Sequence, residues 1–108
     1  MLVLTLPGRV RGMIPVAAMT DDEDARLLSA YAAGDRAAFE PLIARHLDAC
    51  WRFARRLTGE DAAADDVVQS AVVEMLRSAT RRRAIGTVRG WMLAIVANVH
   101  RARARAWA

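Results

Sequence analysis

Residues 64–76, with the sequence ADDVVQSAVVEML, limit the possible folds of this chain more than any other segment. Two adjacent carboxylates and a glutamine open the segment, and the rest is almost wholly apolar. At about 100° per residue, one apolar side of a helix would contain Ala64, Val67, Val68, Ala71 and Met75. A helix that is apolar nearly all round is buried on two sides. The segment therefore predicts a helix with one side in its own core and a second side against something else.

The second side of this helix would be an apolar strip flanked by polar groups. It contains Asp65, Gln69, Val73 and Leu76, with Val72 lying between the two sides. Two occupants fit the pattern. The short helix expected at residues 24–33, with Leu27, Leu28 and Tyr31, can cover the strip within the same domain. Alternatively, another protein docks there.

The rest of the chain is also helical in pattern, and no period-two alternation persists. The four expected helices run roughly over residues 24–33, 36–57, 62–79 and 88–106. Gly34 and Gly59 end the first two, while Asp35, Asp61 and Thr87 are expected to cap the last three. With aromatic residues at only 6 %, the core should be thin. We therefore expect an all-α fold, a small antiparallel helical bundle of three main helices plus a short N-terminal helix.

Two of these helices have a readable core stripe. In the helix at 36–57 the stripe comprises Phe39, Leu42, Ile43, His46, Cys50, Phe53, Ala54 and Leu57. His46 is therefore expected to be a packed histidine, and Arg45 is expected to point away. Pro41 would lie past the first turn and remove one backbone hydrogen bond. In the last helix the stripe comprises Val88, Met92, Ile95 and Val99, with Trp91 at its edge.

The basic residues are concentrated at the C-terminal end. The formal net charge of the chain is +4, yet residues 77–108 alone carry eight arginines and no acid. Such an asymmetry indicates a polyanionic partner. Within this segment, Asn98, Arg101 and Arg105 share a helix face turned away from the core stripe, where they can donate to bases and phosphates. The preceding loop adds Arg81, Arg82 and Arg83 as an electrostatic funnel for a strand.

Catalytic patterns have little support in this sequence. No nucleophile is accompanied by a base and an orienting group, and no phosphate-binding glycine loop or pair of metal ligands is present. We therefore expect no enzyme activity, no cofactor and no metal. Cys50 is the only cysteine, which favours the reducing cytoplasm. No apolar run reaches the roughly 18 residues of a membrane span, so we expect no membrane partner. One alternative remains, in which a basic amphipathic helix of this chain lies on anionic lipid.

The N-terminal residues differ in character from the rest. Residues 1–20 are expected to form a disordered leader, and residues 21–108 the folded domain. Pro7, Gly8 and Gly12 interrupt the apolar run, so the leader is a poor signal peptide. Met19 precedes an acidic run and is a second possible start.

Several segments in order resemble region 2 of bacterial extracytoplasmic-function (ECF) sigma factors, which direct RNA polymerase to promoters. They are Asp24–Leu28, Gly34–Phe39, Phe53–Gly59, Ala64–Gln69 and Val88–Asn98. The resemblance covers roughly residues 21–106, and its specificity comes from the order and spacing of the segments.

The resemblance implies a role for each surface. In such factors the third helix docks on the clamp helices of the largest core polymerase subunit, which assigns Asp65, Asp66, Gln69, Val73 and Leu76 to polymerase binding, with Val72 beside them. The following loop and the fourth helix hold the non-template strand of the −10 promoter element, with a base flipped from the stack. By position, Arg81, Arg82, Arg83, Asn98, Arg101 and Arg105 inherit that role. Melting would be driven by binding to the extruded strand.

The sequence also departs from the family pattern. An aromatic residue is usual near Val72 and near Val88, and neither position has one here. The family's second domain, which reads the −35 element, has no counterpart among the 108 residues. The alternative function is therefore a truncated or stand-alone module that binds polymerase or an anti-sigma factor without reading DNA.

Overall fold

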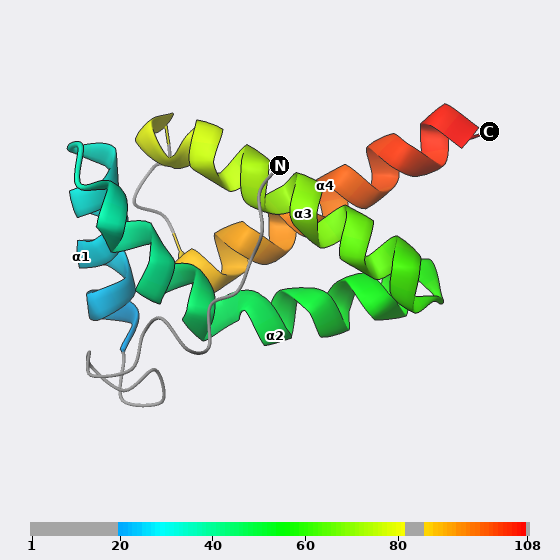
Figure 1. Ribbon diagram of the computed structural model, residues 1–108, viewed down its shortest axis with the longest axis horizontal. Coiled ribbons are helices and arrows are strands. Elements are labelled where there is room, and N and C mark those ends of the chain that lie inside the picture. The colour runs from blue at the N-terminus through cyan, green and yellow to red at the C-terminus, as the bar shows by residue number, and fades with distance from the viewer. Residues whose placement is uncertain (1–19, 82–85, 108) are drawn as a thin grey trace.

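The computed structural model describes residues 20–81 and 86–107, and these residues are almost entirely helical (Figure 1). The α-helices are α1 (Asp21–Ala32), α2 (Phe39–Thr58), α3 (Asp61–Ser78) and α4 (Val88–Trp107). Two short 3-10 turns, η3 (Arg36–Ala38) and η4 (Ala79–Arg81), precede α2 and follow α3. No strand occurs within the described residues, so the expected all-α class is confirmed. Residues 1–19 of the expected leader lie outside these residues, as does the middle of the arginine-rich loop, whereas Thr20 is described.

The N-terminal ends of α1 and α2 differ from the sequence-based boundaries. The Thr20 hydroxyl accepts the backbone N–H of Glu23 at 3.2 Å, so α1 starts three residues before the expected start. The carboxylate of Asp35 accepts the N–H of Ala37 at 3.2 Å and starts η3, not α2 itself. Pro41 consequently lies in the first turn of α2, where backbone N–H groups have no partner within the helix. The expected loss of a backbone hydrogen bond at Pro41 is therefore wrong.

A tight connection turns α2 back into α3. Gly59 ends α2 in the left-handed conformation, with φ at 83°, and its N–H donates to the Arg55 carbonyl at 2.9 Å. Asp61 does not cap α3 as expected, because it is already the first residue of the helix. Its carboxylate instead accepts the Arg55 Nε–H at 2.7 Å. The ion pair and the glycine together bring α2 and α3 into an antiparallel hairpin.

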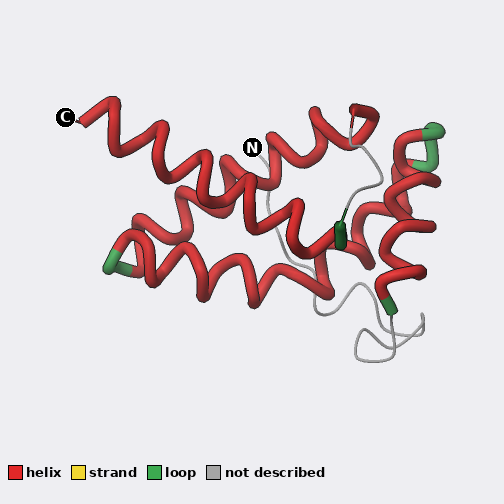
Figure 2. Tube along the Cα trace, turned by 180° about the vertical axis from the view of Figure 1, so that it is seen from behind, coloured by secondary structure: helices red, strands yellow, loops and turns green. Residues whose placement is uncertain are grey.

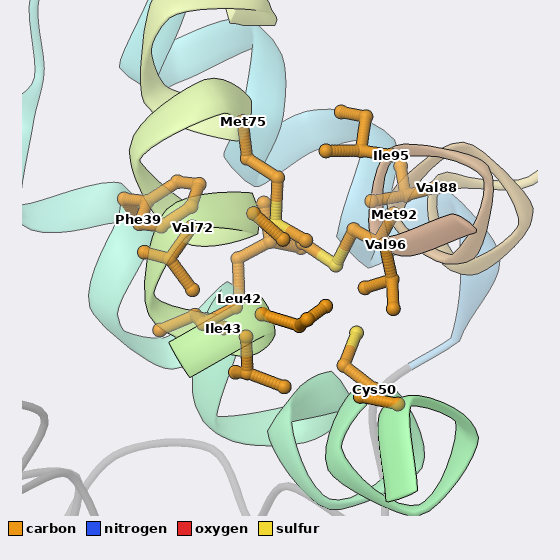
Figure 3. Packing of buried hydrophobic residues seen from close by; sticks show 14 of the residues in the cluster. Phe39, Leu42, Ile43, Cys50, Val72, Met75, Val88, Met92, Ile95 and Val96 are labelled. Atoms are coloured by element: carbon orange, nitrogen blue, oxygen red, sulfur yellow. The ribbon is translucent and has the colours of Figure 1, made fainter. Parts of the chain in front are cut away.

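The core lies where α2, α3 and α4 meet (Figure 3). Leu42, Met75 and Met92 are fully buried, one from each helix. All five residues of the expected inner side of α3 are buried, which confirms that part of the helix assignment. In α4 the stripe is shifted, because Val96 is fully buried while Val99 is only half-buried. Phe53, Leu57 and Trp91 are half-buried and pack against the core.

The arrangement of the helices leaves one side of α3 uncovered. α1 lies at one end of the bundle, where it approaches α2, α4 and the two 3-10 turns (Figure 1). Within the described residues its backbone does not come close to α3. The first half of α4 lies beside α2, and its C-terminal turns diverge from the α2–α3 hairpin (Figure 2). The Thr87 hydroxyl caps α4 as expected, accepting the Gly90 N–H at 3.0 Å.

Candidate docking and nucleic-acid surfaces

The outer face of α3 is open to solvent and centred on Val73. Val73 is 38 % exposed, more than any other large hydrophobic residue whose side chain the structure describes. Asp66 and Gln69 are exposed beside it, and Leu76 is half-buried at the edge. The α1 backbone does not come close to α3, and Asp66, Gln69 and Val73 remain exposed, so the first helix does not cover these three residues. Val72 does not belong to the face, since it is 1 % exposed and packs in the core.

The two adjacent carboxylates of α3 point to different neighbours. Asp65 accepts the Trp51 indole N–H at 2.7 Å, which joins α3 to α2. Asp66 Oδ2 lies 3.6 Å from Arg103 Nη2, which joins α3 to α4. Both carboxylates stay exposed, so the ion pair of Asp66 is a weak surface contact that a partner's arginine can replace. Asp66, Gln69, Val73 and Leu76 are therefore called the docking face below.

The predicted basic face of α4 is solvent-exposed. Asn98, Arg101 and Arg105 are all exposed, and the Arg101 guanidinium donates to the Asn98 side-chain oxygen. This contact leaves the remaining donors of Arg101 facing solvent. Arg81 is exposed at the end of η4, whereas Arg82 and Arg83 lie outside the described residues. Asn98, Arg101 and Arg105 form the α4 basic face.

A buried polar cluster joins three helices, and the sequence analysis missed it. Asp24 and His46 are 0 % exposed, and His46 Nε2 lies 2.8 Å from Asp24 Oδ2. Arg45 Nη1 lies 2.5 Å from the same carboxylate oxygen, so the expectation that Arg45 points away from the interior is wrong. From α4, Arg89 Nε donates to His46 Nδ1 at 3.1 Å. The one signal in the sequence was a histidine on an apolar stripe, because a buried imidazole needs partners.

The protonation of His46 follows from these contacts. Because Arg89 donates to Nδ1, that nitrogen accepts, and the ring proton sits on Nε2 facing Asp24. Burial lowers the pKa of His46 below its ordinary value of 6.5, and this effect outweighs the attraction of Asp24. A neutral histidine therefore connects α1 and α4 through α2. His46 is buried, as expected of a packed histidine, and its hydrogen bonds to Asp24 and Arg89 satisfy both ring nitrogens.

An open groove of about 590 Å³ lies between α2 and the first turns of α4. Arg52, Arg56 and Arg89 line it together with Phe53 and Leu93, and we call these five residues the basic groove. Ala49, Trp51 and Arg55 also line it, and Arg55 is paired with Asp61 of α3. The sequence analysis did not single out this groove, because its residues come from two helices about 40 positions apart.

Two further features are lacking within the described residues. No group of three or more His, Cys, Asp or Glu side chains there is placed to hold a metal ion. None of the helices found there is both long enough and apolar enough to cross a membrane.

Comparison with known proteins identifies the family to which this chain belongs. Residues 42–108 match the family model Sigma-70 region 2, and the chain therefore belongs to that family. This confirms the resemblance to region 2 of ECF sigma factors. No solved structure gives a significant match.

Two curated relatives share substantial sequence with the chain. Both carry the name ECF RNA polymerase sigma factor SigM and come from Mycobacterium tuberculosis, strains H37Rv and Erdman. They are 40 % and 39 % identical over 75 residues. Each match covers 69 % of this chain and 38 % of the relative, so the chain spans well under half the length of these proteins.

Proposed function

We propose that this domain binds core RNA polymerase through α3 and holds the non-template strand of the −10 element with α4 and the preceding loop. The observation that carries the polymerase role is the docking face. An exposed valine flanked by a carboxylate and an amide, on a helix whose opposite side fills the core, suits a helical partner that bears arginine and apolar side chains. The names of the relatives support the same role.

Support for the nucleic-acid role comes from the α4 basic face. Two exposed arginines and an asparagine stand four and three residues apart, which places them on one side of the helix. Such groups position a strand through its phosphates and can donate to base edges. The chemistry is binding alone, so any melting of the duplex draws on the affinity for the unpaired strand.

The second candidate function is a polymerase- or anti-sigma-binding module that does not read DNA. One observation favours it. Val72 and Val88 stand at or near positions where the family usually has aromatic residues, and both are 1 % exposed. Neither position therefore offers a stacking surface to a base.

The experiment that separates the two functions measures fluorescence anisotropy of a labelled −10 non-template strand, with and without core polymerase. The first function predicts binding that tightens when polymerase is added and weakens when the −10 sequence is scrambled. Capture of polymerase with equally weak binding to both strands would support the second function and contradict the first.

A further inference from the structure

The basic groove has a charge pattern that its own chain leaves partly unbalanced. No carboxylate lines it. Asp48 pairs with Arg52 at 3.0 Å, but both side chains are largely exposed, so water and salt weaken this ion pair. Arg56 forms no salt bridge within the described residues. Arg89 donates to the neutral ring of His46, which leaves its positive charge unopposed.

The groove also offers apolar surface between its arginines. Phe53 from α2 and Leu93 from α4 are half-buried, so part of each side chain remains open to solvent. Alternating positive and apolar groups suit single-stranded nucleic acid, whose backbone is anionic and whose unpaired bases present flat apolar faces. In a paired duplex those base faces are stacked inside, so they cannot contact the apolar side chains of the groove.

The groove and the α4 basic face lie on different sides of the same helix. Arg101 stands eight residues after Leu93, about 12 Å along the helix and about 80° around it, and Arg105 lies about 120° around it. Arg89 stands one turn before Leu93 on the groove side, and Arg52 and Arg56 line the groove from α2. A strand that lies on Arg101 and Arg105 therefore has to pass round α4 as well as along it to reach the groove, which only a long strand can do.

We infer that the basic groove is a second contact site for single-stranded nucleic acid, which carries the path of the strand from α4 onto α2. The inference rests on the proposed nucleic-acid function of α4 and extends it to Arg52, Phe53, Arg56, Arg89 and Leu93. An acidic protein segment shares the negative charge of such a strand but lacks its bases. Competition with polyglutamate distinguishes these two ligands.

The test uses the full chain and labelled oligothymidylates of about 6 and about 18 nucleotides, because one small binding surface covers several nucleotides. Arg52→Gln with Arg56→Gln removes two groove charges. Arg26→Gln with Arg36→Gln removes two exposed charges from α1 and η3 and is the matched control. The wild-type chain should bind the long strand at least about fivefold more tightly than the short one.

The groove variant should lose most of that gain, while the control should keep it. For the long strand, the groove variant should also flatten the log–log salt dependence by about 1.4, since each lost phosphate contact removes about 0.7.

A second variant should strengthen binding of the long strand. Asp48→Asn frees Arg52 and should tighten long-strand binding about twofold to threefold relative to Asp22→Asn, an exposed control on α1 with the same charge change.

Each result has one meaning. If the groove variant matches its control on both strands while the wild-type chain still binds, the inference is overturned and the α4 role stands. If the wild-type chain binds neither strand, the proposed nucleic-acid function fails as well. If polyglutamate of equal charge displaces the long strand as well as unlabelled strand does, the groove is an acidic-protein site and the inference fails.

Discussion

His46 Nε2 lies 2.8 Å from Asp24 Oδ2, and this contact links α2 to α1 in the interior of the domain. Arg45 approaches the same oxygen and also donates to the Thr20 carbonyl at 3.1 Å, beside the start of α1. A buried carboxylate thus fixes a short helix that has only one buried large apolar residue, Leu28. These polar contacts hold α1 in place together with the packing of Leu28 and of the Tyr31 ring on Phe39.

Replacing Asp24 should therefore destabilise the domain. Asp24→Ala leaves the His46 ring and the partly buried guanidinium of Arg45 without their acceptor, and we expect a loss of about 3 kcal/mol in the free energy of unfolding. Asp22→Ala removes an exposed carboxylate from the same helix turn and should change stability by less than about 0.5 kcal/mol. Urea denaturation followed by circular dichroism measures both. Equal midpoints for the two variants would show that the buried cluster contributes nothing.

The buried histidine also predicts how stability depends on pH. The folded-state pKa of His46 is lowered from 6.5, so the unfolded chain binds the proton first as the pH falls. The stabilisation is fully present above pH 6.5 and is lost as the pH falls from there toward the folded-state pKa. Denaturation midpoints measured across this window should decrease, and His46→Gln, which retains His100, should flatten the decrease. An unchanged slope in that variant would assign the effect to other groups.

Cys50 reports on the integrity of the core. Its side chain is 1 % exposed, and burial raises the pKa of its thiol to about 11. At pH 8 the folded chain should therefore resist alkylation by iodoacetamide, and labelling should proceed through unfolding. Adding urea below the unfolding midpoint should accelerate labelling in proportion to the unfolded fraction. Fast labelling that is insensitive to urea would show that the packing of α2 on α4 is open.

The α4 basic face predicts a defined salt dependence. Arg101→Ala with Arg105→Ala should flatten the log–log salt dependence for a strand of about 6 nucleotides by about 1.4, if each arginine contacts one phosphate. Arg26→Ala with Arg36→Ala is the control, because both residues are exposed on α1 and η3. Anisotropy titrations at several salt concentrations give the slopes. The same slope in both double variants would place the strand elsewhere.

Much of the fold was predictable because its signals are local. The inner side of α3 follows from helical periodicity alone, and Gly59 ends α2 because only a left-handed residue fits that turn. Boundaries were less secure, since Thr20 and Asp35 can each cap a helix or a shorter turn. The width of a buried helix side is not encoded in the spacing either. Val72 lies about 80° round α3 from the centre of the inner side, and the buried side is wide enough to include it.

The site was predictable only where one helix carries it. The docking face and the α4 basic face each follow from spacing along a single helix. The cluster of Asp24, His46 and Arg89 depends on three helices meeting, and no local pattern encodes that meeting. The basic groove was missed for the same physical reason, since α2 and α4 form it together. The partners of Asp65 and Asp66 likewise became visible only when the helices were placed in space.

The docking face carries the central claim, and Val73 is its most informative residue. The decisive measurement is the affinity of labelled full chain for core RNA polymerase, comparing Val73→Asp with Ser29→Asp, which adds the same charge at an exposed position on α1. We expect Val73→Asp to weaken binding by about 30-fold or more, because it buries an unpaired charge at the centre of the contact, while Ser29→Asp stays within about twofold of wild type. Equal affinities for the two variants, both folded by circular dichroism, would contradict the claim that α3 meets the polymerase.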